Sequence, residues 1–156
     1  MASMLRVRRT VETKESGAAM GQVSIRYIVN DVDAAIGFYV GLLGFAEVMH
    51  PAPGFAMLSR GPLRLLLSAP GATDASGAPG GGGHALADGT LPTPGGWNRF
   101  SLQVEDVAAQ AARLAAAGVV LRTGVINGVG GRQVLVEDPS GNLVELFEPA
   151  LPEAAE

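Results

Sequence analysis

The residue best placed to do chemistry is a glutamate in the middle of an apolar strand near the end of the chain. Glu145 stands within the segment 143–147, directly after the turn sequence Asp-Pro-Ser-Gly-Asn at 138–142. A carboxylate among apolar neighbours needs a partner, such as a metal ion, a cationic side chain or a donor on a ligand. The alternative is a glutamate on the exposed face of a half-buried strand. Both interpretations fit the pattern, so Glu145 is the first candidate to place.

The composition restricts what could surround this carboxylate. The 156 residues include no cysteine, which excludes disulfides, thiolate zinc sites and cysteine nucleophiles. Of the two histidines, His50 precedes a proline turn and His84 lies in a glycine-rich segment, and solvent-exposed positions are expected for both. For His50 the alternative is a place at the mouth of a ligand cavity. A metal site would therefore depend mainly on oxygen ligands.

Charge and hydropathy argue against several classes of partner. The chain has 11 Lys and Arg against 15 Asp and Glu, a net charge of −4, which disfavours non-specific binding to nucleic acid. No apolar run approaches the roughly 20 residues of a membrane span, and the N-terminus lacks a stretch typical of a signal peptide. We expect a cytoplasmic protein with a small-molecule partner, and neither nucleic acid nor membrane.

The elements that would position Glu145 follow from local patterns. Apolar spacing predicts a helix from Val32, with Asn30 or Asp31 as its cap, and a second helix opened by Glu105 or Asp106. Gly44 and Gly118 end the two helices. Alternating β-forming residues predict strands. The expected strands are 23–29, 45–49, 54–59, 63–68, 99–104, 119–122, 132–137 and 143–147. Turn signals at 51–54, 60–62 and 138–142 separate them.

The same order of elements occurs twice: a strand, a helix ended by glycine, then three strands. Asp31 and Asp106 open the two helices at matching positions, and 63–70 matches 142–149. A duplicated βαβββ module explains this order, and it predicts an α+β fold. Each copy would place its helix on one face of its sheet and leave the other face free. Two such sheets side by side would form a curved mixed-sheet trough, a natural ligand cavity.

These patterns divide the chain into modules and connecting segments. The glycine- and proline-rich connection is too long for an ordinary loop, so we interpret it as a linker with a mobile segment; a lid is the alternative. The start of the chain is polar and without period, so disorder is expected there, and Met20 is a possible natural start. The divisions are 1–21 (N-terminal extension), 22–70 (first module), 71–96 (linker), 97–149 (second module) and 150–156 (tail).

Two stretches carry a resemblance to a known family. They are DVDAAIGFYVGLLGF at 31–45 and EDPSGNLVELFEP at 137–149. The chain resembles the vicinal oxygen chelate superfamily, which includes glyoxalase I, bleomycin resistance proteins and extradiol dioxygenases. The resemblance spans residues 22–149 and implies the fold described above. It also implies pairing of modules in a homodimer.

The resemblance implies a metal site only where the ligands are present. Catalytic members carry a histidine in the first strand of each module and a glutamate in the last. The corresponding positions are Ser24, Leu66, Arg99 and Glu145, of which only Glu145 has the expected ligand chemistry. Leucine cannot coordinate, and arginine brings a permanent positive charge. We expect no cofactor; the alternative is a divalent metal held in part by Glu145.

Strand parity predicts the residues that replace the metal site. Alternate positions of the first strand of each module share the face opposite the helices, and we predict that Arg99 pairs there with Glu145 and presents donors to a ligand. Alternatively, the arginines lie at sheet rims or bind a neighbouring subunit. Trp97 could stack on a planar ligand or anchor the packing of the modules. The candidate ligand-binding residues are Ser24, Arg26, Trp97, Arg99, Ser101, Gln103 and Glu145.

Three functions remain open from the sequence. The first is a binding protein of the resistance or sequestration type that holds a small organic molecule in the sheet trough. The second is a divalent-metal-dependent lyase, isomerase or dioxygenase of the same superfamily, with Glu145 supported by Glu47 or His50. The third is a metal-free isomerase or cyclase that uses Glu145 as its catalytic group beside an arginine. Whether the chain is an enzyme is left open.

Overall fold

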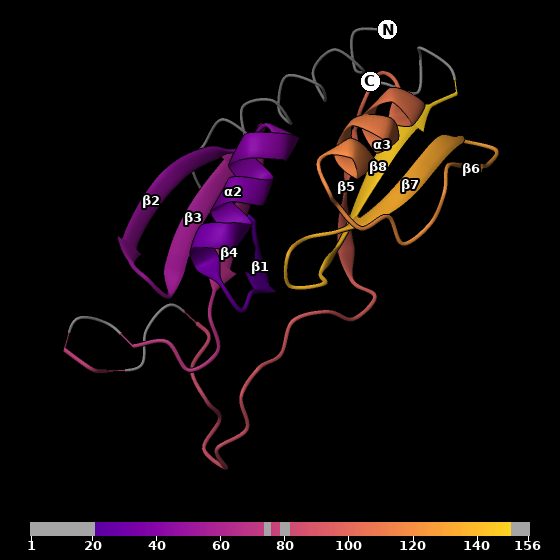
Figure 1. Ribbon diagram of the computed structural model, residues 1–156. Coiled ribbons are helices and arrows are strands. Elements are labelled where there is room, and N and C mark those ends of the chain that lie inside the picture. Colours follow the sequence, from indigo (N-terminus) through magenta and orange to yellow (C-terminus); the bar gives the residue numbers. More distant parts are fainter. Residues whose placement is uncertain (1–20, 74–75, 79–81, 151–156) are drawn as a thin grey trace, which may run out of the picture.

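The chain folds into two modules joined by a long connection (Figure 1). The computed structural model describes residues 21–73, 76–78 and 82–150, so the predicted N-terminal extension and tail lie almost entirely outside the described residues. The first module consists of β1 (Ser24–Ile28), α2 (Val32–Leu43), β2 (Ala46–Ala52), β3 (Phe55–Arg60) and β4 (Leu63–Ser68). The second consists of β5 (Arg99–Gln103), α3 (Val107–Ala116), β6 (Ile126–Asn127), β7 (Gly131–Glu137) and β8 (Leu143–Pro149). The predicted duplication of a βαβββ module is confirmed.

Each module forms its own four-stranded sheet. The strand orders are β1-β4-β3-β2 and β5-β8-β7-β6. In both sheets the first strand pairs with the last in parallel, and the other strands pair antiparallel. The sheets are therefore mixed, as the predicted α+β fold requires, and β1 and β5 lie nearest the junction between the modules (Figure 1).

The two helices begin and end as the sequence predicts. Asp31 and Asp106 are the N-caps, and each carboxylate accepts a 3.0 Å hydrogen bond from the backbone N–H three residues later. Gly44 follows α2 with a φ of 75°, the left-handed conformation that ends many helices. Neither described helix is long and apolar enough to cross a membrane.

The helix-side face of each sheet is buried in one core that extends across both modules. Tyr27, Phe100 and Tyr39 meet at the junction, where the rings of Tyr27 and Phe100 have centroids 5.2 Å apart. The opposite faces carry the polar residues predicted by strand parity, which are exposed on β1 and β5, whereas Leu135 and Leu143 on the second sheet are buried. We call these faces, opposite the helices, the open faces of the two sheets. Val23 departs from the expected pattern: it precedes β1 and is 78% exposed.

Two predicted boundaries are wrong. The segment 119–122 is not a strand; it makes backbone hydrogen bonds to β7 from Val120 and Arg122, plus one isolated bridge, while the outer strand β6 comes later. These bonds are too few and too irregular to form a ladder. The predicted turn at 51–54 is also shorter, because β2 continues through Pro51 to Ala52. An outer strand tolerates proline, since one of its edges needs no donor.

Candidate functional site

The predicted ion pair between Arg99 and Glu145 is present on the open face of the second sheet. The parallel register of β5 and β8 places Ser101 directly beside Glu145 and leaves Arg99 two residues earlier on the same face. Arg99 Nε donates to Glu145 Oε1 at 3.1 Å. The two side chains are 31% and 16% exposed, so the pair is accessible but partly shielded from water.

The pair keeps hydrogen-bonding capacity that the described part of the chain does not use. No described residue bonds to Nη1 or Nη2 of Arg99, or to Oε2 of Glu145. Leu135 lies opposite Glu145 on β7 and is only 6% exposed, and Phe147 follows on the same face of β8. The site therefore offers donors and an acceptor side by side, with the partly exposed Phe147 on the same face of the sheet.

Trp97 stands at the start of the second module with its ring largely in solvent. The residue is 70% exposed, which contradicts the alternative of a packing anchor between modules. Arg122 Cζ lies 5.6 Å from the ring centroid, within cation–π range. Arg122 also donates to Glu137 Oε2 at 2.7 Å. The open face of the second sheet thus carries a second balanced ion pair, next to an accessible aromatic ring.

Ser24 and Arg26 lie on the first sheet, whereas Arg99 and Glu145 lie on the second. Register places Arg26 beside Leu66 and Ser24 beside Arg64. Arg26 Nη1 donates to Ser68 Oγ at 2.7 Å.

Part of the linker packs against the guanidinium of Arg26. A Cβ on Gly82 would come within 2.1 Å of Nη1, so the linker backbone lies directly on this side chain. Gly83 is buried, and its carbonyl accepts a 2.7 Å hydrogen bond from Gly71. The glycines of the linker therefore serve a close backbone approach at these two positions.

The residues at the family's metal positions do not fit a divalent cation. Ser24, Leu66, Arg99 and Glu145 supply one carboxylate, one hydroxyl, one alkyl group and one permanent cation. Among residues 21–73, 76–78 and 82–150, no group of three or more His, Asp or Glu side chains could hold a metal. The family's metal chemistry therefore has no matching donor set here.

The two other residues considered for a metal site lie elsewhere. Glu47 and His50 belong to β2, the outer strand of the first sheet, and the described residues contain no group of three or more possible metal ligands that would join them to Glu145. His50 is in a strand and not in a turn, and its ring nitrogens lie 3.8 Å from carboxylate oxygens of Glu47 and Asp33. His84 is exposed in the linker, as expected.

A buried polar cluster joins the turn at 138–142 to the first module, and the sequence did not predict it. Asp138 and Asn142 are both only 4% exposed. Tyr39 Oη donates to Asp138 Oδ2 at 2.8 Å, and Asn142 Nδ2 donates to the carbonyl of Ile28 at 2.8 Å. Burial, and then the charge of Asp138, raise the pKa of Tyr39 well above its ordinary value. The turn thus fixes one module on the other.

Tyr27 makes the second polar contact across the junction. Its hydroxyl donates to the carbonyl of Leu143 at 2.6 Å and accepts from the backbone N–H of Phe100 at 3.3 Å. Burial raises the pKa of Tyr27 to about 12. A sequence signal for these contacts does exist. The only two tyrosines of the chain both fall on positions of the core, where a buried hydroxyl needs a hydrogen-bond partner.

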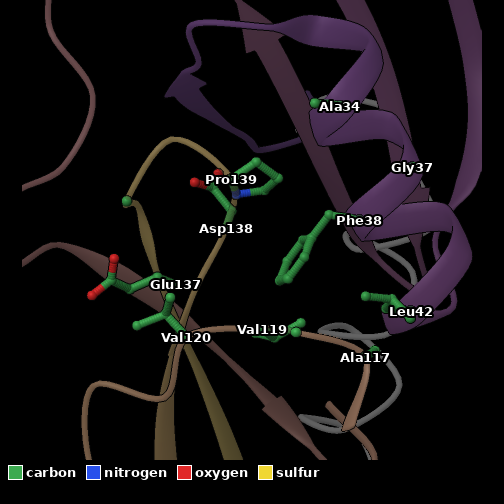
Figure 2. A pocket seen from close by; sticks show the side chains of 12 residues that line it. Ala34, Gly37, Phe38, Leu42, Ala117, Val119, Val120, Glu137, Asp138 and Pro139 are labelled. Atoms are coloured by element: carbon green, nitrogen blue, oxygen red, sulfur yellow. The ribbon is translucent and has the colours of Figure 1, made fainter. Parts of the chain in front are cut away.

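A cavity of about 420 Å³ lies on the helix side of the junction (Figure 2). Figure 2 shows Phe38 pointing into it from α2, with Val119 and Pro139 on the other side. The charged groups on its wall are already bonded, Glu137 to Arg122 and Asp138 within the polar cluster. None of the predicted ligand-binding residues lines it, so we place the candidate site on the open face of the second sheet.

Comparisons with known proteins agree with the fold. A family model, the Glyoxalase/Bleomycin resistance protein/Dioxygenase superfamily, matches residues 21–146. Among curated proteins, no significant match is found. Lactoylglutathione lyase from Agrobacterium tumefaciens has a similar structure, with a TM-score of 0.60 and 23% identity over 84% of this chain and 95% of that chain.

An antibiotic binding protein is also among the similar structures. TnmS3 from Streptomyces sp. CB03234 gives a TM-score of 0.58 and 26% identity, over 85% of this chain and 98% of that chain. A superfamily member from Sphaerobacter thermophilus DSM 20745 gives 0.60 and 24%, over 83% and 97%. The family match covers most of the chain and agrees with the observed pair of βαβββ modules. The chain therefore belongs to the Glyoxalase/Bleomycin resistance protein/Dioxygenase superfamily.

Proposed function

We propose that this protein binds and sequesters a small organic molecule on the open face of its second sheet, without a metal. The observation that carries the proposal is the Arg99–Glu145 pair, which stands at two of the family's metal positions with donors and an acceptor still available. Ser101 and Gln103 extend the polar surface along β5. Trp97 would contact a planar part of the ligand.

The similarity to TnmS3 supports binding over catalysis. That protein is described as an antibiotic binding protein, and its identity to this chain is 26%. The similarity to lactoylglutathione lyase, at 23% identity, supports the fold alone. The polar residues of the open face and the poor donor set for a metal agree with a site that holds an organic molecule by hydrogen bonds and stacking.

The first test is a screen of drug-sized aromatic acids, amides and amines, followed by backbone NMR. Ligands that bind should shift the signals of Ser101 and Gln103. Arg99→Ala should weaken binding by about tenfold or more, because a hydrogen bond from a charged donor is lost. The matched control is Arg132→Ala, which removes an arginine paired with Glu148 on the same sheet and should leave the affinity unchanged. Equal losses in both variants would place the ligand elsewhere.

A second test addresses the metal directly. Addition of Mn²⁺, Fe²⁺, Ni²⁺ or Zn²⁺ should not shift or broaden the NMR signals around Glu145. Stoichiometric binding of any of these ions at Glu145 would contradict the proposal and favour a metal-dependent enzyme. The measurement is independent of ligand identity.

We also propose that the protein works as a homodimer. Val48 and Met49 on β2 are 50% and 45% exposed, and Ile126 on β6 is 46% exposed, so both outer strands present apolar side chains. Exposed apolar surface of this kind is typical of protein–protein contacts. Light scattering should give twice the mass of one chain, and Met49→Glu should reduce it. A monomer at high concentration would refute this part of the proposal.

A further inference from the structure

We infer that the Arg99–Glu145 pair selects an uncharged ligand group that carries a hydrogen-bond acceptor and a donor side by side. Amides, imides and hydroxyl groups next to a carbonyl have this arrangement. The inference rests on the proposed function, because it specifies the chemistry of the molecule held at that site.

The geometry of the pair supplies the argument. Because Nε of Arg99 is bonded to Oε1 of Glu145, the nitrogens Nη1 and Nη2 are the donors left for a ligand. On the glutamate, Oε2 is the acceptor left. A ligand must therefore offer an acceptor to the arginine and a donor to the carboxylate to satisfy both. A carboxylate ligand has no donor for Oε2, and an ammonium ligand has no acceptor for Nη1 or Nη2.

The charge balance of the open face points the same way. The acidic side chains of β7 and β8 on this face are each paired with an arginine: Glu137 with Arg122 and Glu145 with Arg99. The third acidic residue, Glu148, is paired with Arg132 on the helix side of the sheet. The described acidic residues of these two strands thus leave no excess negative charge on the open face that would favour a cation. An anionic ligand at Arg99 would lie close to the charge of Glu145 and lose much of its attraction.

The neighbouring apolar residues indicate the rest of the ligand. Phe147 follows Glu145 on the same face of β8 and is partly exposed, whereas Leu135, opposite Glu145 on β7, is buried beneath this surface. Trp97, whose ring is accessible, precedes Arg99 by two residues in the chain. A flat apolar body that ends in an amide-type group matches this sequence of surfaces.

The test compares two probes that share one ring system. 2-Naphthamide presents an acceptor and a donor, whereas 2-naphthoate presents only acceptors and a negative charge. Affinities are measured by NMR titration and by fluorescence, because Trp97 is the single tryptophan of the chain. The wild-type protein should bind 2-naphthamide at least about tenfold more tightly, the loss expected when a charged acceptor is left without a donor.

Substitutions at the pair should change this preference in a defined direction. Glu145→Gln keeps the shape of the side chain but leaves Arg99 without its counter-charge, so the preference should move towards 2-naphthoate. The matched control is Glu148→Gln, which breaks the Arg132–Glu148 pair on the same strand and should leave the ratio of the two affinities unchanged. Circular dichroism of both variants confirms that they are folded.

Each outcome decides the inference. Tighter binding of 2-naphthoate to the wild-type protein, or an unchanged ratio in Glu145→Gln, would overturn it. Absence of binding by both probes would also overturn it. The proposed function fails separately, if no member of the ligand screen shifts the signals of Ser101 and Gln103. Ligands that bind there without preference for the amide would leave the proposed function standing and remove this inference.

Discussion

Asp138→Ala tests whether the buried polar cluster holds the two modules together. Asp138 accepts four hydrogen bonds, from Tyr39 Oη, Ser140 N, Asn142 N and Asn142 Nδ2, at 2.8 to 3.0 Å. Alanine would leave the donors of Tyr39 and Asn142 in a site that is almost closed to water. Each buried donor without a partner costs about 1–3 kcal/mol, so the free energy of unfolding should fall by roughly 4 kcal/mol. Tyr39→Phe removes only one donor and should cost about 1 kcal/mol.

The assay is urea unfolding followed by circular dichroism. The slope of the free energy against urea concentration must be compared between variants, because two modules that separate would change it. The control is Glu105→Ala, which removes an exposed carboxylate with no described partner and should change stability by less than about 0.5 kcal/mol. A loss below about 1 kcal/mol for Asp138→Ala would refute the role of the cluster, since even one stranded donor should cost that much.

Three further predictions concern glycine and tyrosine. Gly37→Ala should raise the free energy of unfolding by about 1 kcal/mol, because the residue lies inside α2 and an added Cβ meets nothing within 4 Å. Lower stability of this variant in urea would contradict the open space around Gly37. Gly131→Ala should lower the free energy of unfolding by at least about 2 kcal/mol in the same assay, because its Cβ would lie 2.1 Å from the carbonyl oxygen of Glu148. Unchanged stability would contradict the close approach of β7 and β8 at this point. Folding raises the pKa of Tyr27 to about 12 and raises the pKa of Tyr39 as well, so both hydroxyls hold their protons more tightly in the folded protein. These two groups should therefore leave the free energy of unfolding constant below pH 10 and lower it as the pH rises from 10 towards 12. Tyrosinate absorbance with an ordinary midpoint near pH 10.0 in the folded protein would show that these hydroxyls are not buried.

The parts of the fold that depend on local chemistry were predictable from the sequence. Asp31 and Asp106 cap helices because a short carboxylate reaches the N–H three residues later, whatever surrounds it. Gly44 ends α2 because it adopts a positive φ without strain. The repeat then predicts the same strand order in both modules, because each copy must bury one face of its sheet under its helix.

The parts that depend on tertiary contacts were not predictable. The segment before β6 has the composition of a strand, but its path is set by the edge of β7 that it must follow. The turn at 138–142 gives the same local signal whether it is exposed or docked. Only the position of Tyr39 and of the carbonyl of Ile28 makes Asp138 and Asn142 buried residues. A local signal of turn type therefore contains no information on burial.

The open faces show why the proposed site involves one module of a duplicated fold. Leu66 and Glu145 occupy matching places on β4 and β8, beside Arg26 and Ser101. In the first module the arginine has no carboxylate beside it on the neighbouring strand, and it is held by a serine and covered by the linker. In the second module the carboxylate is present, and Arg99 holds it. Both modules need the same buried face to fold, but among the described strands the arginine–carboxylate pair occurs on the open face of the second sheet, where Glu145 stands in place of Leu66.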